Sequence, residues 1–342
     1  MEDFILMQMI KTVLISVILL LFNSGILWAT EEEAANADPV DPKIHWSASP
    51  IFFSSPETGI AIGGYIMGYQ SSDPNFSSGK QNSLNGILVY TEEEQVAFNL
   101  SIKKYFQDDR YLLIVSGGYS DFPSKFYGIG PDTDEDSEED FTLVESAYTG
   151  SFLWKLAPNF YLGPFISYGV FDVKDRTAGG QLAVGNINGW DGTTVVGGGF
   201  QLLRDTRDDN YMPRNGSVLN VQALSYCPEW GSDQEFLQYG ITYKYFWPVG
   251  QTGTLALMSL ISLSDGTVPF EMMPCLGGET IMRGYYSGLY RDRDYAAFQG
   301  EYRYVISTRV SGVFFVSLGE VASELDHFNS ENIKAATGFG FR

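Results

Sequence analysis

Residues 237–247 of the chain read Leu-Gln-Tyr-Gly-Ile-Thr-Tyr-Lys-Tyr-Phe-Trp. From the first residue to the last, every second side chain is large and apolar or aromatic, and the side chains between them are mostly small or polar. Alternation with period two is typical of a β-strand that has one apolar face. The stretches 96–103 and 298–306 repeat the pattern. A soluble sandwich would bury such a face in its core, whereas a transmembrane barrel would turn it toward lipid.

The composition favours the transmembrane barrel. The 342 residues include 37 Gly, 21 Tyr and 24 Phe, and 44% of all residues are hydrophobic. Outer-membrane barrels need this combination, because their lipid-facing surface is apolar with aromatic girdles and their curvature depends on glycines. The formal net charge is -21, which argues against nucleic acid as a partner.

Much of the acidic charge is local. Acidic residues crowd the stretches 92–94 and 132–140. We interpret both stretches as solvated loop tips, and binding of divalent cations at the surface is the alternative.

The N-terminal part of the chain is predicted to be a signal peptide over residues 1–30. Residues 10–28 form a long apolar run with Lys11 near its start and small residues after it, which is the arrangement of a secretory signal. Residues 31–43 are acidic and contain several Ala and Pro residues, and they are predicted to be a flexible linker. No later run reaches the ~20 apolar residues that a membrane helix needs. The remaining segment, 44–342, is therefore predicted to be an outer-membrane β-barrel domain.

The predicted connections between strands alternate between short turns and longer loops. The expected short turns are 107–110, 157–159, 248–251 and 307–309, and the expected longer loops are 118–141, 172–193 and 264–295. Outer-membrane barrels keep short turns on the periplasmic side and long loops outside. With the first strand running outward, every predicted long loop falls outside and the chain contains about fourteen strands. The expected fold class is all-β, a transmembrane antiparallel β-barrel.

The two cysteines of the chain, Cys227 and Cys275, fall on the same outer side in this topology. Two cysteines in an exported chain can form a disulfide. A Cys227–Cys275 disulfide and two free thiols both remain open from the sequence.

Residues 276–285, Leu-Gly-Gly-Glu-Thr-Ile-Met-Arg-Gly-Tyr, fall in the sixth outer loop, between the eleventh and twelfth predicted strands. A glycine pair followed by Arg-Gly-aromatic resembles the signature loop of the BamA/TamA outer-membrane superfamily (bacterial surface antigen family), which occupies the same loop. Three other segments resemble family motifs in the same order along the chain. They are 55–59 at the first hairpin, 127–130 at the entry to the third outer loop and 204–208 at a periplasmic turn. The resemblance extends over residues 50–342.

The resemblance implies a site in the barrel lumen. In the family the loop arginine, here Arg283, folds back into the lumen and pairs with carboxylates on the inner wall. Alternation independently places Glu301 and Arg303 inward on the twelfth strand, and Ser317 stands where the family has a second acid on the next strand. Because a loop arginine against a buried carboxylate makes a strong charge-assisted hydrogen bond, Glu301 is expected to be its main partner. The complete loop motif is Gly277, Gly278, Arg283, Gly284 and Tyr285.

A second group of polar residues lies at the periplasmic turn that resembles the family's Asp-Thr-Arg-Asp motif. A self-paired, hydrogen-bonded turn and a docking surface are the two interpretations of this group. Its members are Asp205, Arg207, Asp208, Pro213 and Gly216.

The chain departs from the family pattern in two ways. Family members usually carry periplasmic POTRA (polypeptide-transport-associated) domains before the barrel, and residues 31–43 leave no room for one, so the chain is expected to belong to the short branch without them. The family barrel has sixteen strands and normally ends in an aromatic residue, whereas this sequence ends in residues 339–342, Phe-Gly-Phe-Arg, which resemble the fourteenth strand. A missing C-terminal hairpin is the favoured explanation, and closure with fewer strands is the alternative.

No catalytic, metal or cofactor site is expected. The chain has no serine elbow or nucleophile loop, and neither His45 nor His327 has ligand-type neighbours at the spacing of a metal site. The resemblance implies instead a protein of the bacterial outer membrane that assists insertion or translocation of proteins. Its partners would be outer-membrane lipid and unfolded or secreted client proteins. A passive pore and a structural surface barrel are the alternatives, and the sequence does not specify an oligomeric state.

Overall fold

A computed structural model of the chain describes residues 44–55, 58–71, 80–278, 280–307 and 310–341. The predicted signal peptide and the predicted linker lie outside the described residues.

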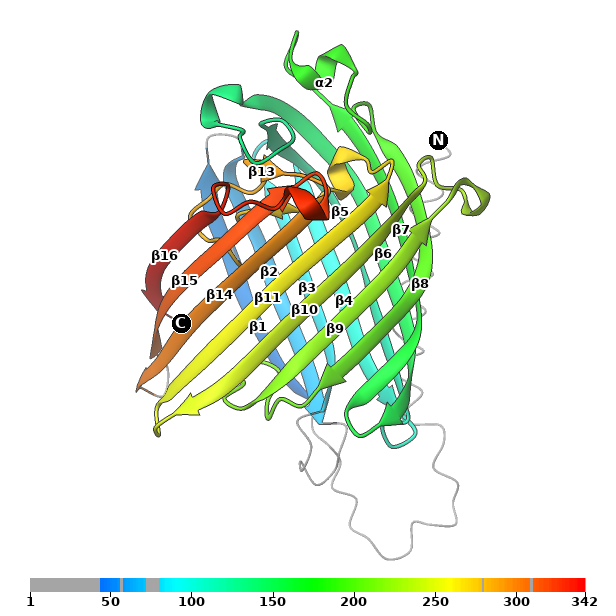
Figure 1. Cartoon of the computed structure of the whole chain (residues 1–342). Coiled ribbons are helices and arrows are strands. Elements are labelled where there is room, and N and C mark those ends of the chain that lie inside the picture. Colours follow the sequence, from blue (N-terminus) through cyan, green and yellow to red (C-terminus); the bar gives the residue numbers. More distant parts are fainter. Residues whose placement is uncertain (1–43, 56–57, 72–79, 279, 308–309, 342) are drawn as a thin grey trace, which may run out of the picture. The chain divides into compact units, whose positions relative to one another are not determined.

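One antiparallel sheet of fourteen strands contains almost all of the regular structure (Figure 1). Its strands pair in the order in which they follow one another along the chain, so the predicted fold class and strand number are confirmed. The strands of the sheet are β1 (His45–Ser55), β2 (Gly59–Ser71), β3 (Gln81–Thr91), β4 (Val96–Phe106), β5 (Tyr111–Phe126), β6 (Glu139–Ala157), β7 (Phe160–Lys174), β8 (Thr193–Asp205), β9 (Gly216–Tyr226), β10 (Phe236–Val249), β11 (Gly253–Gly266), β14 (Asp294–Ser307), β15 (Val310–Ala322) and β16 (Lys334–Phe341).

The pairing of β10 with β11 shows how the sheet satisfies its backbone. Phe236 lies opposite Gly266 at one end, and Val249 lies opposite Gly253 beside the turn at the other. All residues between them are paired in register. Because no water in a bilayer core can bond a free amide, continuous ladders of this kind allow strands to cross it.

The two faces of the sheet differ as the alternation predicts. On β14, Phe298 is 52% exposed on the outer face, whereas Gln299 is only 7% exposed on the inner face. On β10, Tyr239 and Trp247 are likewise exposed, while Lys244 lines a cavity on the inner side. Exposed aromatic residues on one face and buried polar residues on the other are typical of a sheet whose outer face contacts lipid.

The predicted loop at 118–141 is wrong in extent. β5 continues to Phe126 and β6 begins at Glu139, so that the connection comprises residues 127–138. Glycines and polar residues near the start of this stretch favour a loop when taken alone, but Pro123 lies opposite Thr142 in an unbroken ladder. Pairing with the neighbouring strand therefore overrides the local sequence.

The outer connections carry short elements of their own, and none of the helices in the described part of the chain is long and apolar enough to cross a membrane. These short elements are η1 (Glu135–Ser137), α2 (Gln181–Val184), η2 (Pro228–Trp230), η3 (Phe270–Met272), β12 (Cys275–Leu276), β13 (Tyr290–Arg291) and η4 (Leu325–His327).

The connection between β11 and β14, residues 267–293, reaches across to strands far from it in the sequence. Phe270 in η3 is buried, and its ring lies 5.4 Å from the ring of Phe126 and 5.8 Å from the ring of Phe141. Leu182 of α2 belongs to the same buried cluster. The outer ends of β5 and β6 are thereby packed against a loop that starts at β11.

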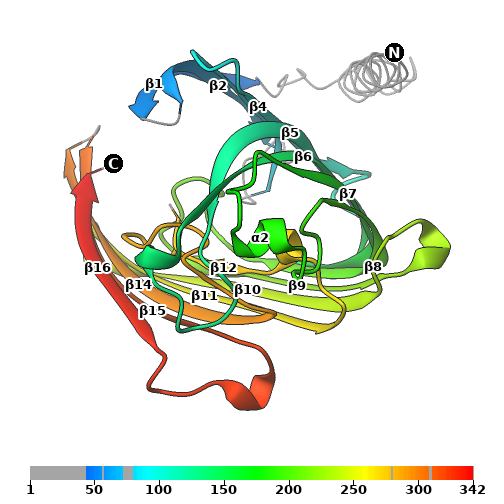
Figure 2. The same cartoon turned by 90° about the horizontal axis from the view of Figure 1, so that it is seen from above.

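Seen from above, the sheet curves around a central space that contains β12 (Figure 2). β1 and β16 are the first and last strands of the sheet order, and no pairing between them is present among the described residues. Each of these two strands therefore pairs along one edge with a neighbouring strand of the described sheet.

We expect Phe298→Arg to destabilise the protein in a bilayer by about 2–4 kcal/mol, because it places a charge on the lipid-facing side of β14 near the middle of the strand. Urea unfolding in lipid vesicles measures this difference in the free energy of unfolding. Thr242→Arg is the matched control, because Thr242 lines a cavity on the inner side. Equal losses of stability for the two variants would contradict the assignment of the outer face.

Candidate functional site

The loop that carries the predicted motif is closed at its base by a short two-stranded ladder. Cys275 of β12 pairs with Arg291 of β13, and Leu276 pairs with Tyr290. Gly277 follows directly with φ of +103°, and a Cβ there would lie 2.7 Å from the carbonyl oxygen of Tyr285. Only glycine satisfies both the left-handed backbone and this close approach.

The predicted residues Arg283, Glu301 and Arg303 come together on the inner wall. Arg283 donates through Nη2 to Glu301 Oε2 of β14, and Arg303 donates through Nε to Glu301 Oε1 at 2.7 Å. Glu301 is only 3% exposed. Both carboxylate oxygens thus accept a charge-assisted hydrogen bond in a buried setting, where such bonds are strong.

Phe315 is the partner of Arg283 that sequence reasoning missed. The guanidinium carbon of Arg283 lies 3.8 Å from the centre of the Phe315 ring, which is a cation–π contact. Phe315 stands on β15 two positions before Ser317, and the same face of the strand carries both residues. A Cβ at Gly338 of β16 would lie 2.6 Å from this ring, so glycine there makes room for it.

Ser317 does not bind Arg283. It is 1% exposed, and its hydroxyl has no hydrogen-bond partner among the described residues. The position at which the family has a second acid therefore contributes no charge to the site here. The aromatic ring of Phe315 lies against the guanidinium group instead.

Apolar side chains of the loop anchor it to the wall. Leu276 and Met282 are fully buried and pack in one cluster with Ala297 and Val321. Gly319 leaves room for the loop, because a Cβ at this position would lie only 2.6 Å from the Leu276 side chain. Small residues on β14 and β15 thus allow the loop to approach the backbone of the wall closely.

The loop also reaches the last strand of the sheet. The hydroxyl of Tyr285 donates a hydrogen bond to the carbonyl oxygen of Ala335 in β16 at 3.0 Å. The Lys334 ammonium group lies 4.4 Å from the centre of the Tyr290 ring. The loop therefore contacts β14, β15 and β16 together.

The motif at residues 127–130 meets the same loop from the other side. The amide of Gly130 donates to the carbonyl oxygen of Arg291 at 2.7 Å. The rings of Tyr127 and Tyr286 lie 5.8 Å apart in an edge-on contact. Two segments singled out from the sequence, far apart along the chain, thus form one structure at the outer end of the lumen.

The turn between β8 and β9, which is predicted to be periplasmic, is paired with itself. Arg207 donates to both carboxylate oxygens of Asp205, through Nε at 2.9 Å and Nη2 at 2.6 Å. Asp208 accepts the backbone amides of Arg214 and Asn215 at 3.0 and 3.2 Å. These bonds fit the interpretation of a hydrogen-bonded turn.

The remaining two members of the turn motif shape its backbone. Pro213 is buried. Gly216 starts β9 with φ of +99°, and a Cβ there would lie 2.2 Å from the carbonyl oxygen of Thr206. Glycine is therefore required where the turn enters the strand.

Cys227 and Cys275 are both free thiols in the structure. Cys227 precedes η2 in the connection between β9 and β10, whereas Cys275 lies in β12. The disulfide considered from the sequence is not formed.

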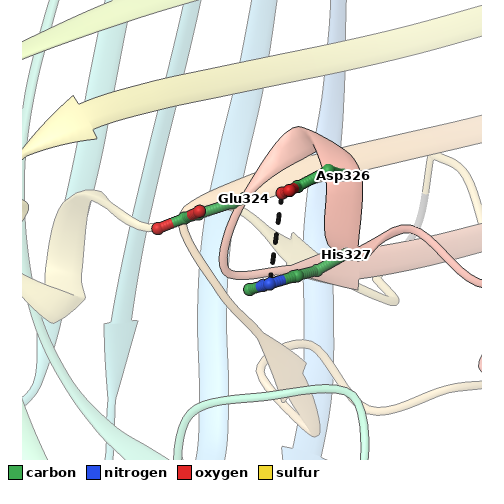
Figure 3. A group of neighbouring side chains, drawn as sticks. All are labelled: Glu324, Asp326 and His327. Carbon is green, nitrogen blue, oxygen red and sulfur yellow. Dashed lines mark ion pairs between the residues drawn. The ribbon is translucent and has the colours of Figure 1, made fainter.

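Glu324, Asp326 and His327 lie close together around η4 (Figure 3), which corrects the expectation that His327 has no ligand-type neighbours. Their potential ligand atoms lie within 4.8 Å of one another, but all three residues are exposed. His327 Nδ1 lies 2.7 Å from the hydroxyl of Ser323, and Glu324 accepts from Arg293 at 3.5 Å. We interpret this group as a solvated surface cluster.

Glu271 in η3 is a buried acid that the sequence did not single out. Both of its carboxylate oxygens are buried without a hydrogen-bond partner among the described residues. Burial raises the pKa of Glu271 to about 8, and Arg291 nearby opposes part of that rise while Asp191 adds to it. A Cβ at Gly189 would lie 2.2 Å from Glu271 Oε2, so the connection between β7 and β8 covers the carboxyl group.

A family model described as the Omp85 superfamily domain matches residues 75–342. The structure is similar to that of BamA from Haemophilus ducreyi lacking POTRA domains 1–3, with a TM-score of 0.56 and 16% identity, over 87% of this chain and 63% of that chain. It is also similar to CdiB from Escherichia coli, with a TM-score of 0.59 and 11% identity, over 90% of this chain and 57% of that chain. No curated protein matches the chain.

The fold and the loop define an outer-membrane type of β-barrel whose sixth outer loop folds into the lumen. The chain belongs to the Omp85 superfamily. The resemblance to the BamA/TamA superfamily is thereby confirmed. Superfamily members are non-enzymatic transport and insertion barrels of the outer membrane. The chain spans about three fifths of the length of the two solved structures.

We expect Arg283→Ala to release the loop from the wall, because it removes a charge-assisted hydrogen bond worth about 1.5–3 kcal/mol. That loss corresponds to roughly a tenfold to hundredfold larger population of released loop. Faster proteolytic cleavage within the loop and higher ion conductance in planar bilayers measure the effect. Arg293→Ala is the control in the same loop, because Arg293 makes only a 3.5 Å contact with the exposed Glu324. Wild-type cleavage and conductance in Arg283→Ala would contradict the anchoring role.

We expect the packing of the outer loops to weaken as pH rises from about 4.5 to about 8. The folded-state pKa of Glu271 lies near 8, above its ordinary value of 4.5, so in this window folded Glu271 keeps a proton that the unfolded chain has lost. Stability therefore falls with pH across the window and does not change further above it. Glu271→Gln should remove this dependence, as measured by thermal unfolding at pH 5 and pH 9. Equal pH dependence in wild type and Glu271→Gln would disprove the assignment, and Glu229→Gln on the exposed η2 is the control.

Proposed function

We propose that this barrel assists the insertion or translocation of proteins at the bacterial outer membrane. Membership of the Omp85 superfamily supports a transport or insertion role in general. The particular role rests on the resemblance of the lumen loop to the BamA/TamA signature and on how that loop is held. The partners would be outer-membrane lipid and unfolded or secreted client proteins.

The observation that carries the proposal is the attachment of the lumen loop to three consecutive strands. Arg283 is bonded to Glu301 of β14 and stacked on Phe315 of β15, and Tyr285 is bonded to Ala335 of β16. A loop held in the lumen by buried charge narrows the path that free diffusion through a pore would use. A loop tied to the last strands fits a barrel in which passage of a client is coupled to movement of the wall.

A passive pore is the second candidate, and one observation favours it. A cavity of about 370 Å³ remains beside the loop, and its mixed lining includes the polar residues Asn220, Gln222 and Thr242 beside the apolar residues Leu260 and Ile281. Open space with polar side chains in the lumen is a feature of channels. A structural surface barrel is the third reading, and no feature of the described residues favours it over the others.

Depletion of the protein in its host, followed by quantitative proteomics of the outer membrane, tests the proposal. We expect loss of several unrelated barrels for an insertion role, or loss of one secreted or surface protein for a dedicated translocator. Re-expression of Arg293→Ala should restore the wild-type proteome, whereas Arg283→Ala should restore it incompletely. An unchanged outer-membrane proteome after depletion would reject the proposal in favour of a pore or a structural barrel.

A further inference from the structure

A second cavity in the lumen, of about 300 Å³, lies between the Arg283–Glu301 pair and the periplasmic turn. Its charged lining consists of Arg207, Lys244, Glu301 and Arg303. Three cations therefore face one carboxylate, in a chain whose formal net charge is -21. The cavity lining therefore carries a net positive charge, although the net charge of the whole chain is negative.

The two carboxylates near the cavity are already bonded to arginines, and two of these, Arg207 and Arg303, belong to the cavity lining. Glu301 accepts from Arg283 on one oxygen and from Arg303 on the other. Asp205 accepts from Arg207, and its Oδ2 lies 3.7 Å from the Lys103 ammonium nitrogen. Neither acid is left to neutralise Lys244.

Lys244 itself has no ion pair and no hydrogen bond in the part of the chain that the structure describes. It stands on the inner face of β10, and its charged neighbours are Arg207 and Arg303. Arg207 and Arg303 are each paired with a carboxylate, whereas Lys244 adds a positive charge beside them that no described acid balances, and such like charges repel more strongly where water is partly excluded. An anion between them would turn this repulsion into attraction.

The same cavity has unused hydrogen-bonding groups besides the ammonium of Lys244. Arg303 bonds Glu301 through Nε, and its terminal nitrogens have no acceptor in the described residues. Gln299 is 7% exposed and lines the cavity, and its amide oxygen has no partner there. The oxygen and nitrogen of such an amide are assigned from the hydrogen-bond network, so a half-turn supplies a donor at this place.

We propose that Lys244, Arg303, Arg207 and Gln299 form a binding site for one oxyanion group, a carboxylate or a phosphate, in the periplasmic half of the lumen. Ammonium and guanidinium groups bind both groups by charge-assisted hydrogen bonds. A volume of 300 Å³ equals that of about ten water molecules at about 30 Å³ each, which accommodates either group with some of its hydration. The site does not depend on the proposed function, because an oxyanion reaches it as a free ion or as part of a polypeptide.

Titration of the purified full chain with inorganic phosphate at low ionic strength, followed by isothermal calorimetry, tests the proposal. We expect saturable binding of about one phosphate per chain. Lys244→Gln should weaken this binding at least tenfold, since a charged hydrogen bond is lost, and Lys244→Arg should largely retain it. Lys174→Gln is the control, because Lys174 pairs with Asp172 at 3.1 Å on β7 and should leave binding unchanged.

Competition separates the two sources of the oxyanion. Displacement of phosphate by a short acetylated peptide containing glutamate, but not by the same peptide containing glutamine, would show that the site also takes a polypeptide carboxylate. Displacement by neither peptide would assign the site to free anions. Both outcomes support the site.

Two results would overturn the proposal. One is the absence of saturable phosphate binding to the wild-type chain. The other is equal binding of phosphate by the wild-type chain and by Lys244→Gln.

Discussion

The backbone hydrogen-bond ladder is the constraint on which the rest of this structure depends. In the hydrocarbon core of a membrane each unpaired amide costs several kcal/mol, so a strand can cross only when its neighbours pair with it along its length. The strands between β1 and β16 meet this condition by pairing in chain order, with register unbroken from Phe236 to Val249 on β10. Period-two alternation then assigns each side chain to lipid or to the lumen. Glu301 and Lys244, the wall residues of the two lumen sites, are inward for that reason.

The lumen is organised by charges of opposite sign on different elements. Arg283 comes from a loop and Glu301 from the wall, and the pair is held between Arg303 and the Phe315 ring. Removing Arg283 would leave one oxygen of the buried Glu301 without its charged partner, which is costly for a buried carboxylate. The loop is also bonded to β16 through Tyr285, so the docked loop links the lumen site to the last strand of the described sheet.

Much of the fold was accessible from the sequence, because alternation and turn spacing are repeated fourteen times and each repeat constrains the next. The order of strands and turns also predicted that residues 276–285 form the sixth outer loop, and the alternation predicted that Glu301 points inward. The sequence does not predict which inward side chains of a strand contact the loop. Phe315 and Ser317 point to the same side of β15, and only the observed docking shows that the ring, not the hydroxyl, contacts Arg283. The burial of Glu271 depends on packing against a connection some eighty residues earlier in the chain, and no local pattern reports it.

The distant contacts of residues 267–293 carry a consequence for how the molecule assembles. Thr133 donates its hydroxyl hydrogen to the carbonyl oxygen of Leu289, a residue 156 positions later in the chain, and Tyr285 is bonded to Ala335, which is made later still. Contacts of such sequence separation form only after the intervening chain has been ordered, because closing a long loop costs entropy before any contact repays it. The contacts of residues 267–293 therefore join strands that lie far before and far after this loop in the chain. We expect these contacts to form late in folding, after the strands that they join have paired.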